Sequence, residues 1–229
     1  WFENKLEVMI QFMENHPQVM VAVNDAEIVD EKLTTPGIRK SRQVLDLGLP
    51  VTSFHSGCCL VFRDQIKSLF LPVPDEVFAH DTWLNRLAVA LDGRGFVDLS
   101  LQYYRRHTQN TSDWIASSTT KKRRLDLMAE KKTADVRYWC SRRIKAVSAL
   151  KKRLQESDSP LLKTPDAQDN VQRTMARCNR EIQAARTRLK LLDKPRLLRI
   201  KGAFAMLVSG VYKEHFSGWQ SFLKDLVRK

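Results

Sequence analysis

Two short polar motifs hold the residues of this chain that are best suited to chemistry. The first is His80-Asp81-Thr82-Trp83, at the predicted start of a helix, and the second is residues 104–110, Tyr-Arg-Arg-His-Thr-Gln-Asn, at the predicted end of a strand. A carboxylate at a helix N-terminus lies in the positive end of the helix dipole and stays ionised at pH 7. It can then accept a proton, although the same field weakens it as a base.

In their order and spacing, the two motifs resemble the acceptor-side half of family-2 glycosyltransferases, especially the bacterial rhamnosyltransferase-like members. The resemblance covers residues 1–116. It implies a GT-A type (Rossmann-like) sheet and an enzyme that transfers a sugar such as rhamnose from a nucleotide-sugar donor. The implied acceptor is a surface-polysaccharide intermediate or a lipid-linked glycan, and the implied reaction inverts the anomeric centre.

The resemblance also assigns residues on the two sides of the reaction. On the acceptor side Asp81 is the base, and His80, Trp83 and Gly57 bind or position the acceptor. On the donor side the resemblance implies a divalent cation, Mg²⁺ or Mn²⁺, beside the leaving diphosphate. The residues associated with the diphosphate or the metal are Arg105, His107 and Asn110, with His107 as the metal ligand.

The resemblance begins at Trp1. In the family, a Trp follows within a few residues of the paired aspartates that bind the cation, and this chain holds neither those aspartates nor a Gly-rich loop. We therefore expect an N-terminally truncated fragment that is inactive alone.

Structural interpretations of the same residues remain open. Asp is a common helix N-cap, so Asp81 can serve as a cap with or without a role as base. His107 can be a strand-end residue that is satisfied by a backbone carbonyl, beside solvated Arg side chains.

Charge divides the chain into two regions. Residues 1–116 carry 11 Lys/Arg and 15 Asp/Glu, whereas residues 117–229 carry 28 and 11. This asymmetry predicts two segments with different tasks: an acceptor-side glycosyltransferase half and a basic helical extension. The expected fold class is thus α/β, a partial GT-A sheet domain followed by a mostly α-helical region.

Hydrophobic spacing predicts the elements of the first region. Residues 19–23 form a buried strand that delivers the acidic segment around Asp25 at its end, and residues 31–52 form a long loop. Val97, Leu99, Leu101 and Tyr103 form the apolar face of a half-buried strand. The remaining elements are a helix over 4–15, a strand over 56–62, a short helix over 64–70 and a helix over 82–91; the alternating strand runs from 96 to 106.

The second region has helical spacing. Val136, Cys140, Ile144 and Val147 form one seam, and the apolar residues from 167 to 189 advance in steps of four and three. A polar break near Pro160 predicts an antiparallel helical hairpin. Pro195 and Gly218 then divide the remainder into two shorter helices.

The basic residues of the second region have three interpretations: solvated helix faces, contact with anionic lipid, and nucleic-acid binding. Nucleic acid ranks last because no nucleic-acid fold motif accompanies the charge. The rival function is a non-enzymatic basic adaptor that binds nucleic acid or a partner helix. The four cysteines form no framework and are expected to pack in the core. The expected location is cytoplasmic, peripheral at the inner face of the plasma membrane.

Overall fold

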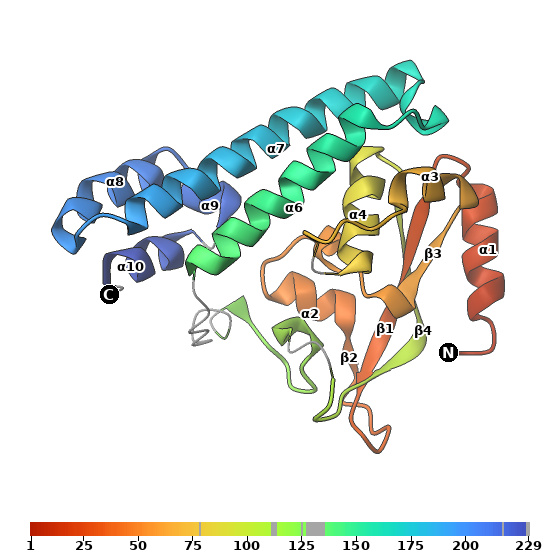
Figure 1. Cartoon of the computed structure of the whole chain (residues 1–229). Helices are drawn as coiled ribbons and strands as arrows, with labels where there is room; N and C mark the ends of the chain where they lie inside the picture. Colours follow the sequence, from red (N-terminus) through yellow and green to blue (C-terminus); the bar gives the residue numbers. More distant parts are fainter. Residues whose placement is uncertain (78, 111–113, 125, 127–135, 217, 228–229) are drawn as a thin grey trace. The chain divides into compact units, whose positions relative to one another are not determined.

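The computed structural model describes residues 1–77, 79–110, 114–124, 126, 136–216 and 218–227 (Figure 1). The chain forms two compact units. The sheet unit contains residues 1–73, 79–131 and 159–167, and the helical unit contains residues 74–78, 132–158 and 168–229. Residues 125 and 127–135 of the predicted basic extension lie outside the described residues.

The sheet unit is α/β, which confirms the general class predicted from the sequence. Its strands and helices in chain order are α1 (Lys5–Asn15), β1 (Val21–Val29), β2 (Ile38–Arg39), α2 (Lys40–Asp46), β3 (Leu60–Phe62), α3 (Lys67–Phe70), α4 (His80–Ala90) and β4 (Arg94–Arg105). Short 3₁₀ turns lie at 51–53, 57–59, 64–66 and 115–117.

Strand β1 is the centre of a mixed four-stranded sheet. Strand β4 pairs with it in parallel along its whole length. Two short strands pair with β1 antiparallel at different ends, β3 beside Val21–Val23 and β2 beside Glu27 and Ile28. Both faces of β1 are covered, so its side chains are buried almost without interruption.

Helices cover the two faces of the sheet. On one face, Met9 of α1 packs in a cluster with Ala22 and Leu101. On the other face, Val23 packs with Val44 of α2 and with Phe54. Gly95 allows α1 to approach β4 closely, because a Cβ atom at Gly95 would lie 2.7 Å from the Phe12 ring.

The predicted alternation along the last strand is only partly correct. Val97 and Leu101 are buried, but Leu99 and Tyr103 are about half exposed. The register explains this result: Asn24 pairs with Val97, yet the next residue of β1 pairs with Ser100. The two extra residues of β4, Asp98 and Leu99, form a bulge in which Leu99 is exposed, and Leu101 then packs in the same cluster as Val97.

Two further predictions for the sheet unit are wrong. Residues 31–52 are not one long loop, because β2 and α2 lie within them. Asp25 does not follow the first strand but lies inside it, fully buried. In the sequence, a polar run inside a strand looks like the end of the strand, because the hydrogen-bond partners that allow its burial are distant in the chain.

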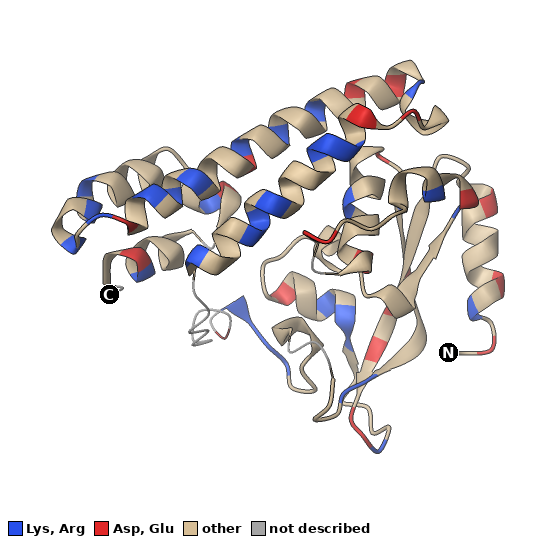
Figure 2. Ribbon diagram, in the orientation of Figure 1, with Lys and Arg blue, Asp and Glu red and all other residues tan. Residues whose placement is uncertain are grey.

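The helical unit is built on the predicted hairpin. Helices α6 (Val136–Glu156) and α7 (Pro165–Leu192) are its two arms, and Lys and Arg are spread along both (Figure 2). Arg143 of α6 donates to Glu181 of α7 at 2.6 Å. Three shorter helices follow rather than the predicted two: α8 (Arg196–Val208), α9 (Val211–His215) and α10 (Trp219–Val227). Gly210, at φ +78°, makes the additional break between α8 and α9.

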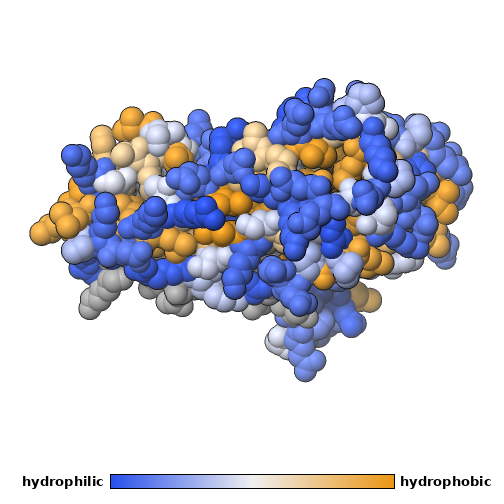
Figure 3. Space-filling view, turned by 45° about the horizontal axis from the view of Figure 1, so that its top comes forward, coloured by the Kyte–Doolittle hydropathy of each residue, from blue (hydrophilic) through white to orange (hydrophobic). Residues whose placement is uncertain are grey.

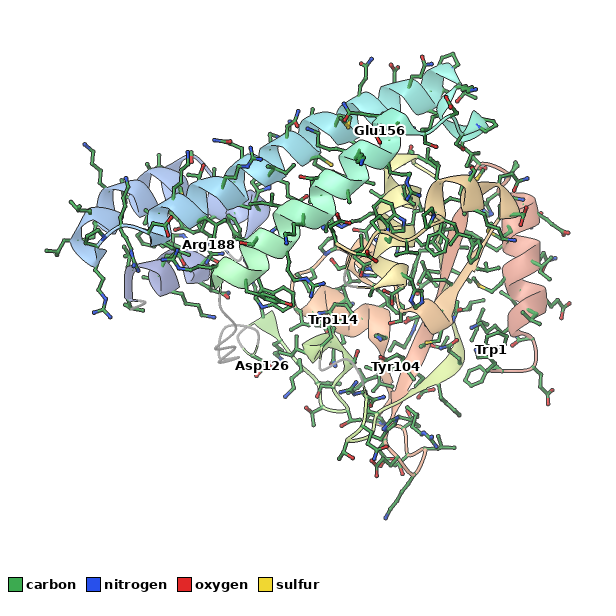
Figure 4. All side chains as sticks on the ribbon, in the orientation of Figure 1. Trp1, Tyr104, Trp114, Asp126, Glu156 and Arg188 are labelled. Carbon is green, nitrogen blue, oxygen red and sulfur yellow. The ribbon has the colours of Figure 1, made fainter. Side chains whose placement is uncertain are left out.

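A buried ion pair fixes α10 in the helical unit. Arg188 of α7 donates two hydrogen bonds to Asp225, from Nε at 2.8 Å and from Nη2 at 2.9 Å (Figure 4). The Tyr212 hydroxyl donates to the same carboxylate at 2.9 Å. All three residues are buried, and burial raises the pKa of Tyr212, with the Asp225 charge adding to the effect. The carboxylate therefore connects α7, α9 and α10.

Asp225→Asn should destabilise the helical unit by about 3–5 kcal/mol, because it leaves the Arg188 charge buried without its counter-ion. Urea unfolding followed by circular dichroism measures the change. The matched control is Asp193→Asn, which removes an exposed partner of Arg137 and should change the free energy of unfolding by less than about 1 kcal/mol. Equal effects of the two substitutions would contradict the role of this ion pair.

Candidate functional site

Asp81 is the second residue of α4 and lies two positions after the N-cap residue, Ala79. Ala79 is extended and precedes the helix, without a side-chain cap hydrogen bond. The Asp81 carboxylate accepts the Thr82 N–H at 2.6 Å through Oδ1 and the Gly57 N–H at 3.1 Å through Oδ2. The helix starts earlier than the sequence predicted, and Asp81 is therefore not its N-cap.

Gly57 lies against the first of the two motifs. An ideal Cβ atom at Gly57 would lie 3.0 Å from Nε2 of His80 and 3.6 Å from Cβ of Asp81. The absence of a side chain allows the backbone of segment 54–58 to pass directly over the first turn of α4. Three residues that the sequence assigned to the acceptor side, Gly57, His80 and Asp81, thus lie at one point.

Trp83 has a different environment. Its side chain is fully buried, and its indole Nε1–H donates to the carbonyl oxygen of Phe70 at 3.0 Å. A side chain without exposed surface cannot contact an acceptor sugar. Of the two roles assigned to Trp83, binding or positioning, only positioning fits this burial.

Segment 54–58 contacts α4 at a second point. Nε2 of His55 lies 3.2 Å from the Thr82 hydroxyl. Burial lowers the pKa of His55 below its ordinary value of 6.5, although the Asp81 charge acts in the opposite direction. The imidazole is therefore mainly neutral at pH 7 and adds no positive charge beside Asp81.

The sequence analysis missed Lys40, a buried cation of the same site. Its Nζ donates to the Ser56 hydroxyl at 2.6 Å and lies 3.3 Å from the centroid of the Tyr104 ring. The rings of Phe54 and Trp114 are within 6 Å of Nζ (Figure 4). Burial lowers the pKa of Lys40 to about 8. No local signal marks this residue, because its aromatic neighbours come from distant parts of the chain.

Asp25 explains why Lys40 points inward. Its buried carboxylate accepts the Ser41 N–H at 3.0 Å and the Arg39 Nε–H at 2.9 Å. It also accepts the Ser41 hydroxyl and the N–H of Ala26. Both neighbours of Lys40 are thus anchored to β1, and Lys40 itself extends under segment 54–58.

The adjacent cysteines differ from each other. Cys59 is buried, as predicted for core packing, but Cys58 is exposed. The Cys59 thiol, whose sulfur lies 3.9 Å away, lowers the pKa of Cys58 to about 6 through a hydrogen bond. Gln102 donates to the Cys58 sulfur at 3.1 Å, and Lys5 donates to the Cys58 carbonyl at 2.8 Å. These contacts hold the backbone next to Gly57.

The donor-side residues form a separate turn. His107 donates its backbone N–H to the Asn110 side chain at 2.7 Å, and the Asn110 amide donates to the Arg105 carbonyl at 3.4 Å. The Gln109 N–H lies 3.2 Å from Nδ1 of His107, and the Asn110 amide nitrogen lies 3.2 Å from Nε2. Both ring nitrogens thus have neighbours inside the turn, but these are a backbone N–H and a side-chain amide nitrogen rather than the carbonyl of the structural interpretation.

The described residues do not fit the implied metal. Across the parts of the chain that the structure describes, no group of three or more His, Cys, Asp or Glu side chains is placed to hold an ion. Asp81 and His107 lie in different contact networks. The metal and diphosphate roles of Arg105, His107 and Asn110 therefore stay predictions.

An open pocket of about 630 Å³ lies elsewhere on the sheet unit. Buried Gln43 builds one wall, because its amide donates to the Ser118 carbonyl at 2.9 Å and accepts the Lys122 N–H at 3.1 Å. The residues that line the pocket are Gly37, Ile38, Arg39, Arg42, Gln43, Asp46, Lys121, Lys122, Arg123 and Arg124. The pocket is strongly basic and contains none of the residues predicted from the two motifs.

Comparison with known proteins gives no family assignment. No protein-family model, curated protein or solved structure matches this chain. No helix among the described residues combines the length and apolar character that crossing a bilayer requires.

The lowered pKa of Lys40 predicts a pH-dependent stability. Unfolded Lys40 has its ordinary pKa of 10.5, so between pH 8 and 10.5 the unfolded state binds more protons than the folded state. The contribution of Lys40 to folding stability should therefore rise across this window, by about 3 kcal/mol in all. Urea unfolding should show that the free energy of unfolding of the wild type, relative to that of Lys40→Met, is larger at pH 10 than at pH 7. For the control Lys67→Met, which changes an exposed side chain, the difference in free energy of unfolding from the wild type should be the same at both pH values. If this difference is also independent of pH for Lys40→Met, the effect of burial is contradicted.

Proposed function

We propose that this chain carries the acceptor-side residues of a family-2, GT-A type glycosyltransferase, with Asp81 as the general base. One observation carries the proposal: the Gly57 N–H donates to the Asp81 carboxylate while His80 lies beside the same glycine. The resemblance assigned these residues to the acceptor side from positions more than twenty residues apart. Their convergence supports that assignment.

The geometry suits a carboxylate base. Asp81 is half-buried, and its carboxylate accepts hydrogen bonds from the Gly57 N–H, the Thr82 N–H and the Thr82 hydroxyl, which fix its orientation. Oδ1 accepts both hydrogen bonds from Thr82, whereas Oδ2, which accepts the Gly57 N–H, retains a lone pair for a further hydrogen bond. A hydroxyl group of the acceptor can therefore donate its proton to Asp81.

The proposed step is an inverting displacement. The acceptor oxygen forms a bond to the anomeric carbon of the donor sugar, the bond from that carbon to the diphosphate oxygen breaks, and the nucleoside diphosphate leaves with the electron pair. The proton of the acceptor hydroxyl moves to Asp81. Lys40 and Ser56 act as positioning residues, because they hold the segment that contains Gly57.

The donor side of the proposal rests on the resemblance alone. The nucleotide-sugar donor, the glycan or lipid-linked acceptor and the Mg²⁺ or Mn²⁺ ion remain predictions. The location at the inner face of the plasma membrane is a prediction of the same kind.

A second candidate function, binding of a polyanion such as nucleic acid, is favoured by the basic pocket. Six of its lining residues are Lys or Arg, against one carboxylate. Sequence-independent binding would weaken steeply with salt. Lys121→Glu combined with Lys122→Glu should then abolish binding of duplex DNA at 150 mM salt, whereas a wild-type chain that binds no duplex at this ionic strength would exclude the function.

Asp81→Asn should lower the turnover number of the full-length protein about 100-fold, the usual scale for loss of a general base. The affinity for the nucleotide sugar should change little, because the base acts on the acceptor. Release of nucleoside diphosphate in the presence of an acceptor glycan measures the first quantity, and calorimetric titration with the nucleotide sugar measures the second.

The matched control is Asp64→Asn, which neutralises an exposed carboxylate of the same unit and should leave turnover unchanged. Near-normal turnover of Asp81→Asn would refute its role as base. Equal loss in both variants would point to a general effect of charge.

A further inference from the structure

The helical unit exposes a set of large apolar side chains on two helices that pack together, α8 and α10. Leu197 is 82% exposed, Val208 71%, and Val227 72%. Figure 3 shows apolar side chains gathered at the left end of the view, where Figure 1 places α8. The set, which we call the α8–α10 surface, consists of Leu197, Ile200, Phe204 and Val208 of α8 with Trp219, Leu223 and Val227 of α10.

The spacing places these residues on one stripe of each helix. Those of α8 are three, four and four residues apart, and those of α10 are four apart, which is the repeat of one helical face. The core of the unit uses other positions, such as Ala203, Met206 and Phe222. Each helix thus has two apolar faces, of which one packs inside the unit and the other faces solvent.

Such a surface needs a covering partner. Soluble proteins rarely expose contiguous apolar patches of this kind unless the patch binds a protein or a membrane. Single exposed apolar residues are ordinary, but seven on two adjacent helices are not.

The charges beside the α8–α10 surface indicate which class of partner binds it. Arg196 and Lys201 of α8, Lys213 of α9 and Lys224 of α10 are exposed. Glu214 is the one exposed carboxylate among the described residues of α8, α9 and α10, since Asp225 is buried against Arg188. Lys is depleted in protein–protein interfaces, whereas apolar faces flanked by Lys and Arg are typical of helices that lie in the surface of an anionic bilayer.

We infer that the α8–α10 surface binds the surface of an anionic lipid bilayer, with its apolar side chains in the boundary between headgroups and acyl chains. Trp219 suits this position, because indole rings favour the membrane interface. The cations of the same helices add attraction to acidic headgroups. This binding is independent of the proposed sugar transfer.

The inference moves the membrane contact away from the hairpin. The sequence suggested a membrane contact through the basic side chains of residues 121–190. Arg143, however, donates hydrogen bonds to Glu181 and to the His215 carbonyl. Lys151 donates to Asn179 of the opposite arm. These hairpin charges stabilise the helical unit itself.

Flotation of the 229-residue chain with vesicles tests the inference. Vesicles of phosphatidylcholine with 30% phosphatidylglycerol should bind the chain, and pure phosphatidylcholine should bind it at least about tenfold more weakly. The triple variant Leu197→Ser, Phe204→Ser, Val208→Ser should lose most of the binding. Because all three side chains are exposed, it should keep the circular dichroism spectrum of the wild type. Lys201→Glu with Lys224→Glu should weaken binding to the anionic vesicles and remove most of its salt dependence.

The matched control is Leu6→Ser with Ile10→Ser, which removes two half-exposed apolar side chains of α1 and should leave vesicle binding unchanged. Binding by the triple variant equal to that of the wild type would overturn the inference, and so would absence of wild-type binding to anionic vesicles. If sedimentation instead shows a wild-type dimer that the triple variant lacks, with no vesicle binding, the surface joins two copies of the chain.

Discussion

The buried carboxylate of Asp25 is the interaction on which the arrangement of the candidate site depends. It lies inside the central strand and binds the residues on both sides of Lys40, the backbone of Ser41 at 3.0 Å and the guanidinium of Arg39 at 2.9 Å. A buried carboxylate is unfavourable unless its oxygens are satisfied, and five donor groups from three residues satisfy this one. The same contacts fix β2 and the start of α2 against β1.

Lys40 is in turn connected to the candidate base, Asp81, through hydrogen bonds of segment 54–58. Lys40 binds Ser56 at 2.6 Å, and the next residue, Gly57, donates its N–H to Asp81 at 3.1 Å. A cation buried among aromatic rings is unfavourable by itself, as the pKa of about 8 shows. Its retention is understandable if Lys40 holds segment 54–58 over the first turn of α4. The helical unit depends on a comparable buried carboxylate, Asp225, which binds Arg188 and Tyr212.

Elements with strong periodicity could be predicted from the sequence, whereas contacts between distant polar residues could not. The helix over 4–15 and the hairpin follow from helical spacing, and both are present. The bulge in β4 left no trace in the alternating pattern, so Leu99 was predicted to lie on the buried face, although it is exposed. Residues 31–52 looked like a loop because they contain Pro36-Gly37 and Gly48-Leu49-Pro50. The burial of Lys40 and Ser41 within them depends on Asp25 and Tyr104, which are distant in the sequence. For the site, the resemblance indicated Gly57, His80 and Asp81 but gave no sign of Lys40 or Ser56.

A double-mutant cycle between Ser56 and Asp81 tests the central claim, that the contacts from Asp25 to Gly57 position Asp81 for sugar transfer. Turnover of a nucleotide sugar is measured for the full-length wild-type protein, Ser56→Ala, Asp81→Asn and the double variant. In the wild-type background Ser56→Ala should lower turnover about tenfold, a loss of about 1.4 kcal/mol. In the Asp81→Asn background it should have almost no further effect, since Ser56 acts through Asp81. Independent losses that multiply in the double variant, or normal turnover of Ser56→Ala, would contradict the account.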